Sequence, residues 1–177
     1  KVRAVAFDKT GVLTTGRPQV QEMIPLDGRG KTEVLEHLAR LEQASEHPLA
    51  QAILRYAALN GVAEVASASF RAIQGRGAEA EVDGKTFWAG STRMLREKGL
   101  EDERAAEEAL RLSDAEHTVV ACGTDEAAWA LLGVSDPPRP EARRVMNELR
   151  RQGIDDLVML TGDNNATAQR VARAIGM

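Results

Sequence analysis

The sequence has few of the residues that mark a disulfide scaffold, a multi-cysteine metal site or a nucleic-acid surface. It contains one cysteine, Cys122, in 177 residues, which excludes an internal disulfide and a zinc site built from several cysteines. Aromatic residues make up 3% of the chain and its net charge is −4. The chain therefore offers neither a base-stacking surface nor a basic one, and we expect no nucleic-acid partner.

Long apolar segments are also missing. No segment approaches the roughly 20 apolar residues that are needed to cross a bilayer, and no signal peptide is visible. The chain opens at Lys1 directly on an apolar strand pattern, so we expect it to be an excerpt of a longer protein. Its composition, 43% hydrophobic and 28% charged, is that of an ordinary globular protein with a core of aliphatic residues.

Hydrophobic periodicity predicts an α/β domain that is interrupted by an inserted α+β domain. We expect residues 1–19 and 134–177 to pair in space as the α/β domain, and residues 20–133 to form the inserted one. The predicted elements of the α/β domain are a buried strand at 2–7, a strand at 157–160 and helices at 141–152 and 165–175.

The inserted domain is predicted to contain an antiparallel sheet. Asp83 and Gly84 form a hairpin turn of the kind that favours positive φ. Pro48 is expected at the first position of a helix that reaches Tyr56 or beyond. The other predicted helices are 31–42, 91–98 and 101–113, and the predicted strands are 69–74, 78–83, 85–89, 118–122 and 127–134.

Asp8 is the first candidate for chemistry, because it follows the first predicted strand and precedes a loop with Gly11. Open α/β sheets bind their ligands at the carboxyl ends of strands. A carboxylate there can accept a phosphoryl group when a metal and backbone donors neutralise the incoming charge. Taken alone, Asp8 is explained more simply as a loop residue that caps a turn.

The string Asp-Lys-Thr-Gly-Val-Leu-Thr at residues 8–14 resembles the phosphorylation sequence of P-type ATPases, with Val12 as the one departure. The resemblance implies that Asp8 becomes phosphorylated with the help of Lys9 and Thr10, and that Asp8 and the Thr10 carbonyl bind Mg²⁺. Phosphatases of the haloacid dehalogenase superfamily usually carry a second Asp at the position of Thr10, as a general acid and base. A threonine cannot perform that proton transfer at neutral pH, which favours a pump over a phosphatase.

Two further strings fit the same family. Thr161, Gly162 and Asp163 follow a predicted strand and precede a helix, where backbone N–H groups favour an anion. Taken alone, the segment is explained more simply by helix capping through Asp163 or Asn164. Thr161, Gly162 and Asp163 resemble a P-type ATPase string in which the Thr contacts the phosphoryl group. The segment Asp136-Pro137-Pro138-Arg139 resembles the hinge between the nucleotide and phosphorylation domains, with Asp136, Pro137 and Arg139 as its marked residues.

His47 selects the subfamily. A histidine before a helix is often a structural cap, but Ser-Glu-His-Pro-Leu at residues 45–49 resembles the His-Pro motif of heavy-metal-transporting P-type ATPases. The resemblance implies that His47 orients the adenine of ATP. It further implies a nucleotide site made by the following residues: Glu42, Glu46, His47, Gly75, Gly77, Gly90 and Ser91.

The resemblance implies a haloacid-dehalogenase-like, Rossmann-like parallel-sheet phosphorylation domain, truncated in this chain, with an inserted nucleotide-binding domain. The implied function is transfer of the ATP γ-phosphate to Asp8, with Mg²⁺, at the cytoplasmic face of a membrane protein. The implied partners are the transmembrane and actuator domains of the parent chain, and the transported ion binds outside this segment. The alternatives are a haloacid-dehalogenase-type phosphatase and a non-catalytic nucleotide-binding fragment.

Overall fold

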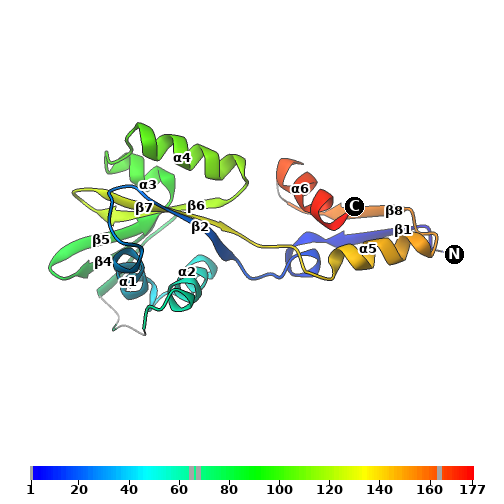
Figure 1. Ribbon diagram of the computed structural model, residues 1–177, viewed down its shortest axis with the longest axis horizontal. Helices are drawn as coiled ribbons and strands as arrows, with labels where there is room; N and C mark the ends of the chain where they lie inside the picture. Colours follow the sequence, from blue (N-terminus) through cyan, green and yellow to red (C-terminus); the bar gives the residue numbers. More distant parts are fainter. Residues whose placement is uncertain (1, 64–65, 67–68, 163–164) are drawn as a thin grey trace. The chain divides into compact units, whose positions relative to one another are not determined.

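The computed structural model describes residues 2–63, 66, 69–162 and 165–177. The chain divides into two compact units. The split unit consists of Lys1–Pro18 together with Asp136–Met177, and the inserted unit is Gln19–Ser135. Each unit has its own apolar core, and Figure 1 follows the chain through both of them.

The split unit is a parallel sheet with helices on one face. Strand β1 (Ala4–Asp8) pairs in parallel with β8 (Asp156–Leu160), with Asp8 opposite Leu160. Helices α5 (Ala142–Arg151) and α6 (Asn165–Ile175) supply most of the core. The side chains that pack together there are Phe7, Leu13, Ala142, Met146, Leu157, Met159, Val171 and Ile175.

The other face of this sheet is exposed, which corrects the expectation of a buried first strand. Residues alternate along both strands, so Phe7 packs towards the helices while its neighbour Ala6 is exposed. On β8, Val158 and Leu160 are 48% and 55% exposed. An apolar run of residues predicts a strand, but it does not predict whether one face or both faces of the sheet are packed against other elements.

A wide turn, Lys9–Leu13, follows β1 and carries the backbone away from the sheet. It is closed by the amide of Thr14, which donates to the Lys9 carbonyl at 3.0 Å. Gly11 has a φ of 77°, a conformation that glycine adopts without steric cost. The turn therefore needs a glycine at this point.

The inserted unit contains a six-stranded antiparallel sheet with the strand order β2-β7-β6-β5-β4-β3. Its strands are β2 (Gln19–Pro25), β3 (Ser69–Ile73), β4 (Gly77–Val82), β5 (Lys85–Gly90), β6 (Thr118–Thr124) and β7 (Ala128–Ser135). The predicted hairpin between β4 and β5 is confirmed, with φ of 52° at Asp83 and 77° at Gly84. Both values are positive, as a tight two-residue hairpin requires.

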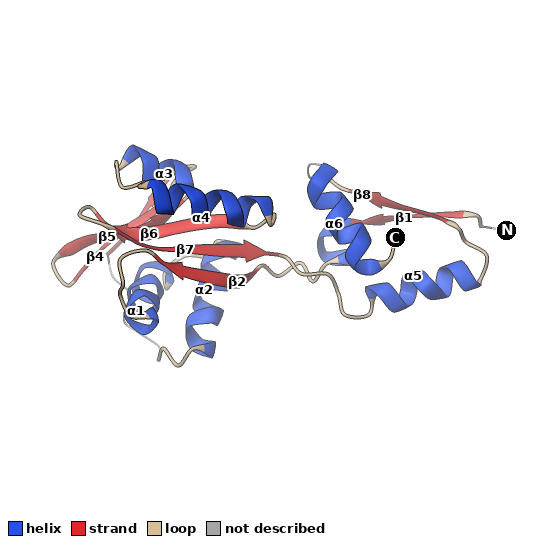
Figure 2. Ribbon diagram, turned by 45° about the horizontal axis from the view of Figure 1, so that its top comes forward, coloured by secondary structure: helices blue, strands red, loops and turns tan. Residues whose placement is uncertain are grey.

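Two helices cover each face of this sheet (Figure 2). Helices α1 (Lys31–Glu42) and α2 (Pro48–Leu59) pack on one side over the larger core cluster. Helices α3 (Thr92–Glu97) and α4 (Glu103–Asp114) pack on the other side around Trp88 and Leu131. The inserted unit is thus an α+β domain with a core on both sides of its sheet.

Strand β2 was not predicted from the sequence. It pairs with β7 from Gln19 opposite Ser135 to Pro25 opposite Ala130. The first and last residues of the inserted unit are therefore direct neighbours. No helix in the described part of the chain has both the length and the hydropathy of a membrane span.

Candidate nucleotide site and phospho-acceptor loop

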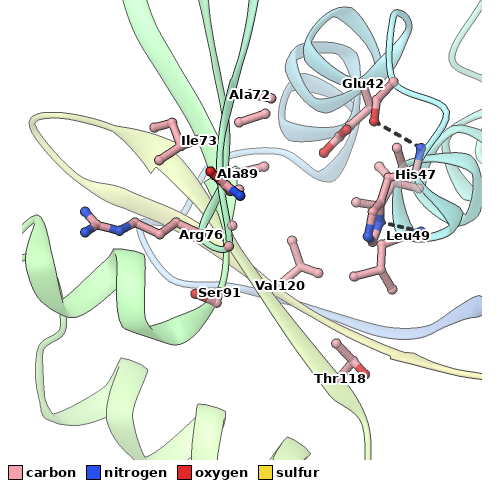
Figure 3. Close-up of a pocket in the computed structure, with 18 of the residues that line it drawn as sticks. Glu42, His47, Leu49, Ala72, Ile73, Arg76, Ala89, Ser91, Thr118 and Val120 are labelled. Atoms are coloured by element: carbon pink, nitrogen blue, oxygen red, sulfur yellow. Dashed lines mark hydrogen bonds between the residues drawn. The ribbon is translucent and has the colours of Figure 1, made fainter.

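A cavity of about 430 Å³ opens in the inserted unit, between α1, α2 and one end of the sheet (Figure 3). Six of the seven residues predicted to bind nucleotide line it, although they come from four separate stretches of sequence. Those six are Glu42, His47, Gly75, Gly77, Gly90 and Ser91. Glu46 is exposed and is not among the residues that line the cavity.

His47 is held by the helix that it starts. It is the N-cap of α2, with Pro48 at the first helical position, and its Nδ1 accepts a hydrogen bond from the amide of Leu49 at 3.2 Å. In the neutral ring the proton is therefore on Nε2, which is a donor. Capping and ligand binding are compatible here, because they use different ring nitrogens.

Glu42 lies at the end of α1 and is 8% exposed. Burial raises the pKa of its carboxyl group to about 7, because the low-dielectric surroundings disfavour the charged form. A buried carboxyl group in a cavity can bind a polar edge of a ligand, and a perturbed pKa is typical of functional sites.

Two glycines make a close backbone approach on the opposite wall. Gly77 on β4 and Gly90 on β5 are paired across the strands. A Cβ on Gly77 would stand 2.1 Å from the carbonyl oxygen of Ala89, and a Cβ on Gly90 would stand 2.4 Å from that of Arg76. Neither position tolerates a side chain, so the pair forms a bare backbone surface.

Ser91 adds a polar atom to this surface. Its amide donates to the Arg76 carbonyl at 2.8 Å, while its Oγ is buried and has no hydrogen-bond partner among the described residues. Buried hydroxyls are normally hydrogen-bonded. The cavity thus combines a bare glycine surface, a buried carboxyl group and an unsatisfied hydroxyl, a set that fits a planar polar ligand such as a nucleotide base.

In the split unit, the parallel pairing brings two predicted residues to the same edge. Asp8 ends β1 opposite Leu160, so Thr161 follows directly at the carboxyl end of the neighbouring strand. Asp8 and Gly162 are exposed. Asp163 lies outside the described residues. Lys9 and Thr10 begin the wide turn, with Thr10 in an extended conformation at ψ 120°.

The loop after Asp8 is tied to Asp136 by hydrogen bonds that sequence reasoning missed. Oδ2 of Asp136 lies 2.6 Å from the Thr14 hydroxyl and accepts from the Gly16 amide, while Oδ1 accepts from the Thr15 hydroxyl and the Arg17 amide. The sequence did mark both segments, because residues 8–14 and 136–139 each match a string of the family. It did not indicate that they touch, because about 120 residues separate them.

Arg139 holds the same loop from another side. Its side chain donates to the carbonyls of Gly11 and Val12, at 2.8 and 3.0 Å, and its amide donates to the carbonyl of Leu13. The amide of Thr15 donates to the Pro137 carbonyl. The predicted hinge residues therefore bind the loop that follows Asp8, and their role as a hinge stays a prediction.

The described residues contain no group of three or more His, Cys, Asp or Glu side chains arranged to hold a metal ion. Mg²⁺ does not need such a cage, since it is commonly bound by one or two carboxylates together with water and substrate phosphates. Asp8 with the Thr10 carbonyl is a donor set of that type.

Residues 2–177 match the family model of haloacid dehalogenase-like hydrolases. The chain belongs to this family. It is 36% identical over 177 residues to a probable copper-transporting ATPase, PacS, of Synechococcus elongatus, covering 99% of this chain and 24% of that protein. It is 38% identical over 176 residues to a zinc-transporting ATPase of Bacillus subtilis, covering 99% of this chain and 27% of that one.

Among solved structures, a zinc-transporting PIB-type ATPase matches with a TM-score of 0.87 and 34% identity, over 100% of this chain and 28% of that one. The resemblance to heavy-metal P-type ATPases and the predicted fold class are both confirmed. The chain spans about a quarter of the length of the curated relatives it matches.

Proposed function

We propose that this chain is the ATP-binding and phospho-acceptor portion of a heavy-metal cation-transporting P-type ATPase. The observation that carries the proposal is the cavity of the inserted unit, where six residues from four stretches of sequence meet. The inserted unit is then the nucleotide-binding domain and the split unit the phosphorylation domain. The parent protein would carry both at the cytoplasmic face of a membrane, with transmembrane and actuator domains outside this segment.

In this proposal the adenine of ATP lies between the His47 ring and the glycine surface of Gly77 and Gly90. Nε2–H of His47 and the carboxyl group of Glu42 supply a donor and an acceptor for the polar edges of the base. The Ser91 hydroxyl gains the hydrogen bond that it lacks in the free cavity.

The proposed reaction is a phosphoryl transfer to Asp8. A carboxylate oxygen of Asp8 attacks the γ-phosphorus, the bond from that phosphorus to the β–γ bridging oxygen breaks, and ADP leaves. Asp8 and the Thr10 carbonyl would hold Mg²⁺, which reduces the repulsion between the two anions. Lys9 and Thr161 would contact the phosphoryl oxygens, and Thr10 would leave the acyl phosphate without a neighbouring general base for hydrolysis.

The nucleotide site is tested by titrating the chain with ATP and a non-hydrolysable analogue while amide resonances are recorded. We expect saturable shifts at Glu42, His47 and Gly75–Gly77. His47→Asn should weaken them, because asparagine keeps the helix cap but removes the ring, and the melting temperature should stay unchanged. A folded sample with no shifts for either nucleotide would overturn the proposal.

A second experiment addresses the phospho-acceptor. The chain is incubated with radiolabelled ATP and Mg²⁺, quenched in acid and treated with hydroxylamine, which cleaves acyl phosphates. Label that is lost with hydroxylamine and absent in Asp8→Asn supports the proposal. Rapid turnover of a small phosphoester without trapped label would instead indicate a phosphatase.

A further inference from the structure

Arg76 stands between Gly75 and Gly77 in the loop that lines the cavity. Among the described residues that line the cavity, it is the one with a permanent positive charge. A nucleoside polyphosphate carries several negative charges, and the one acidic residue among the described residues that line the cavity is Glu42. The position of Arg76 thus matters for any charged ligand of this cavity.

The backbone of Arg76 is fixed on both sides. Its amide donates to the Ile73 carbonyl at 3.0 Å, which closes the turn through Gly75, where φ is 69°. Its carbonyl accepts from the Ser91 amide at 2.8 Å and lies against Gly90. The side chain therefore extends from a rigid anchor, and only its guanidinium group is free to change partner.

The guanidinium group is held by one exposed ion pair. Its Nη1 lies 2.8 Å from Oε2 of Glu97 on α3, and the two side chains are 46% and 35% exposed. The other carboxylate oxygen of Glu97, Oε1, lies 2.8 Å from Nε of Arg93. Exposed pairs of this kind contribute little to stability, and Glu97 keeps Arg93 as a partner if Arg76 leaves.

Figure 3 shows Arg76 extending away from the end of the cavity at which Glu42 and His47 lie. Glu42 and His47 thus lie on one side of the Arg76 backbone, and the guanidinium group extends to the other side. A nucleotide likewise carries its base at one end and its negatively charged phosphates at the other.

We propose that Arg76 binds the phosphate chain of the nucleotide and exchanges Glu97 for phosphate oxygens when the ligand enters. This inference rests on the proposed function, since it assumes that the cavity takes a nucleotide base. A guanidinium group can bind phosphate through two parallel, charge-assisted hydrogen bonds, whereas its ion pair with Glu97 joins one nitrogen to one oxygen. In this proposal Glu97 is the counterion of Arg76 until the ligand binds.

The test compares the affinities of adenosine, AMP, ADP and ATP for the wild type and for Arg76→Gln, by calorimetry without metal. In the wild type, affinity should rise with the number of phosphates and the gain should shrink as salt is added. Arg76→Gln should weaken ADP and ATP by roughly tenfold, as expected for loss of a charge-assisted contact, and leave adenosine within about twofold.

Two variants serve as controls. Glu97→Gln releases Arg76 from its counterion, so it should increase the affinity for ATP severalfold. This effect is opposite in direction to that of Arg76→Gln. Arg93→Gln removes the other partner of Glu97 without changing a residue that lines the cavity, so it should leave the ratio of ATP to adenosine affinity close to that of the wild type.

The outcomes separate this inference from the proposed function. If adenosine binds but Arg76→Gln weakens adenosine and ATP by the same factor, or weakens neither, the role of Arg76 is overturned while the nucleotide site stands. If neither adenosine nor ATP binds the folded wild type, both proposals are overturned.

Discussion

The hydroxyl of Thr14 lies 2.6 Å from Oδ2 of Asp136, although 122 positions separate the two residues. Thr14 is fully buried, and its hydroxyl also accepts from the Gly11 amide. The shape of the loop that follows Asp8 therefore depends on a carboxylate from the far end of the chain. Sequence motifs that are treated as two separate signatures form one hydrogen-bonded assembly.

Removing the charge of Asp136 should loosen this assembly. We expect Asp136→Asn to destabilise the split unit by about 2 kcal/mol, because hydrogen bonds to a charged acceptor are replaced by weaker ones and one donor loses its partner. Hydrogen exchange should accelerate at the amides of Gly16 and Arg17. Asp155→Asn, at an exposed position of the same unit, should change stability by less than about 0.5 kcal/mol and leave those amides protected. Equal exchange in both variants would contradict this role of Asp136.

The two glycines of the cavity loop should respond differently to alanine. Gly77→Ala should destabilise the inserted unit by more than about 3 kcal/mol, because the new Cβ would stand 2.1 Å from the Ala89 carbonyl oxygen. Gly75→Ala has open space around it, so it should cost about 1 to 2 kcal/mol from its positive φ alone. Urea unfolding measures both. Gly28→Ala, at a φ of 80° away from the cavity, is the matched control and should resemble Gly75→Ala in stability while leaving nucleotide affinity unchanged.

The buried carboxyl group of Glu42 should make stability depend on pH. Its pKa is raised from 4.5 to about 7 by burial, so between these values the folded state binds more protons than the unfolded state. The contribution of the protonated Glu42 side chain to the free energy of unfolding is therefore fully present below pH 4.5 and is lost as the pH rises through 7. We expect Glu42→Gln to be more stable than the wild type at pH 8, by up to about 3 kcal/mol, and to lose that advantage near pH 4.5.

Denaturant titrations at several pH values check this prediction. Glu107→Gln, at an exposed position of α4, should follow the wild type at every pH. A Glu42→Gln variant whose stability parallels the wild type from pH 5 to 8 would show that the carboxyl group is ionised in the folded state.

The inserted unit should fold without the rest of the chain. Residues 19–135 are continuous, contain two core clusters and begin and end in paired strands. We expect this fragment to unfold in one cooperative transition and to keep the amide spectrum that these residues have in the whole chain. A fragment with poorly dispersed resonances would show that Gln19–Ser135 depends on the split unit for its stability.

Local signals explain why much of the fold could be predicted. The Asp83-Gly84 turn, the start of α2 at Pro48 and the apolar spacing of α1 each depend on a few neighbouring residues. Strand β2 escaped prediction because a bulge between Val20 and Glu22 breaks its alternation. A half-buried strand is predicted from apolar and polar residues that alternate with a period of two, and the bulge interrupts this alternation.

The candidate site was predictable in its members but not in its contacts. The motifs identified the glycines at 75, 77 and 90, but only the pairing of β4 with β5 determines that Gly77 and Gly90 cannot carry a Cβ. The hydrogen bonds of Asp136 and Arg139 to the loop that follows Asp8 join segments whose proximity depends on the whole intervening chain. Such contacts leave no local pattern.

The pairing of Gln19 with Ser135 has a consequence for the order of folding. The two segments of the split unit are connected by more than one hundred residues. If that connection were flexible, bringing its ends together would cost roughly 4 kcal/mol in chain entropy. Once the inserted unit has folded, its first and last residues are adjacent, because Gln19 pairs with Ser135. Most of the entropic cost has then been met by the folding of the inserted unit. The Asp8 loop and Asp136 can then meet almost as if they were neighbours in sequence, so the inserted unit should fold first and act as a template for the split one.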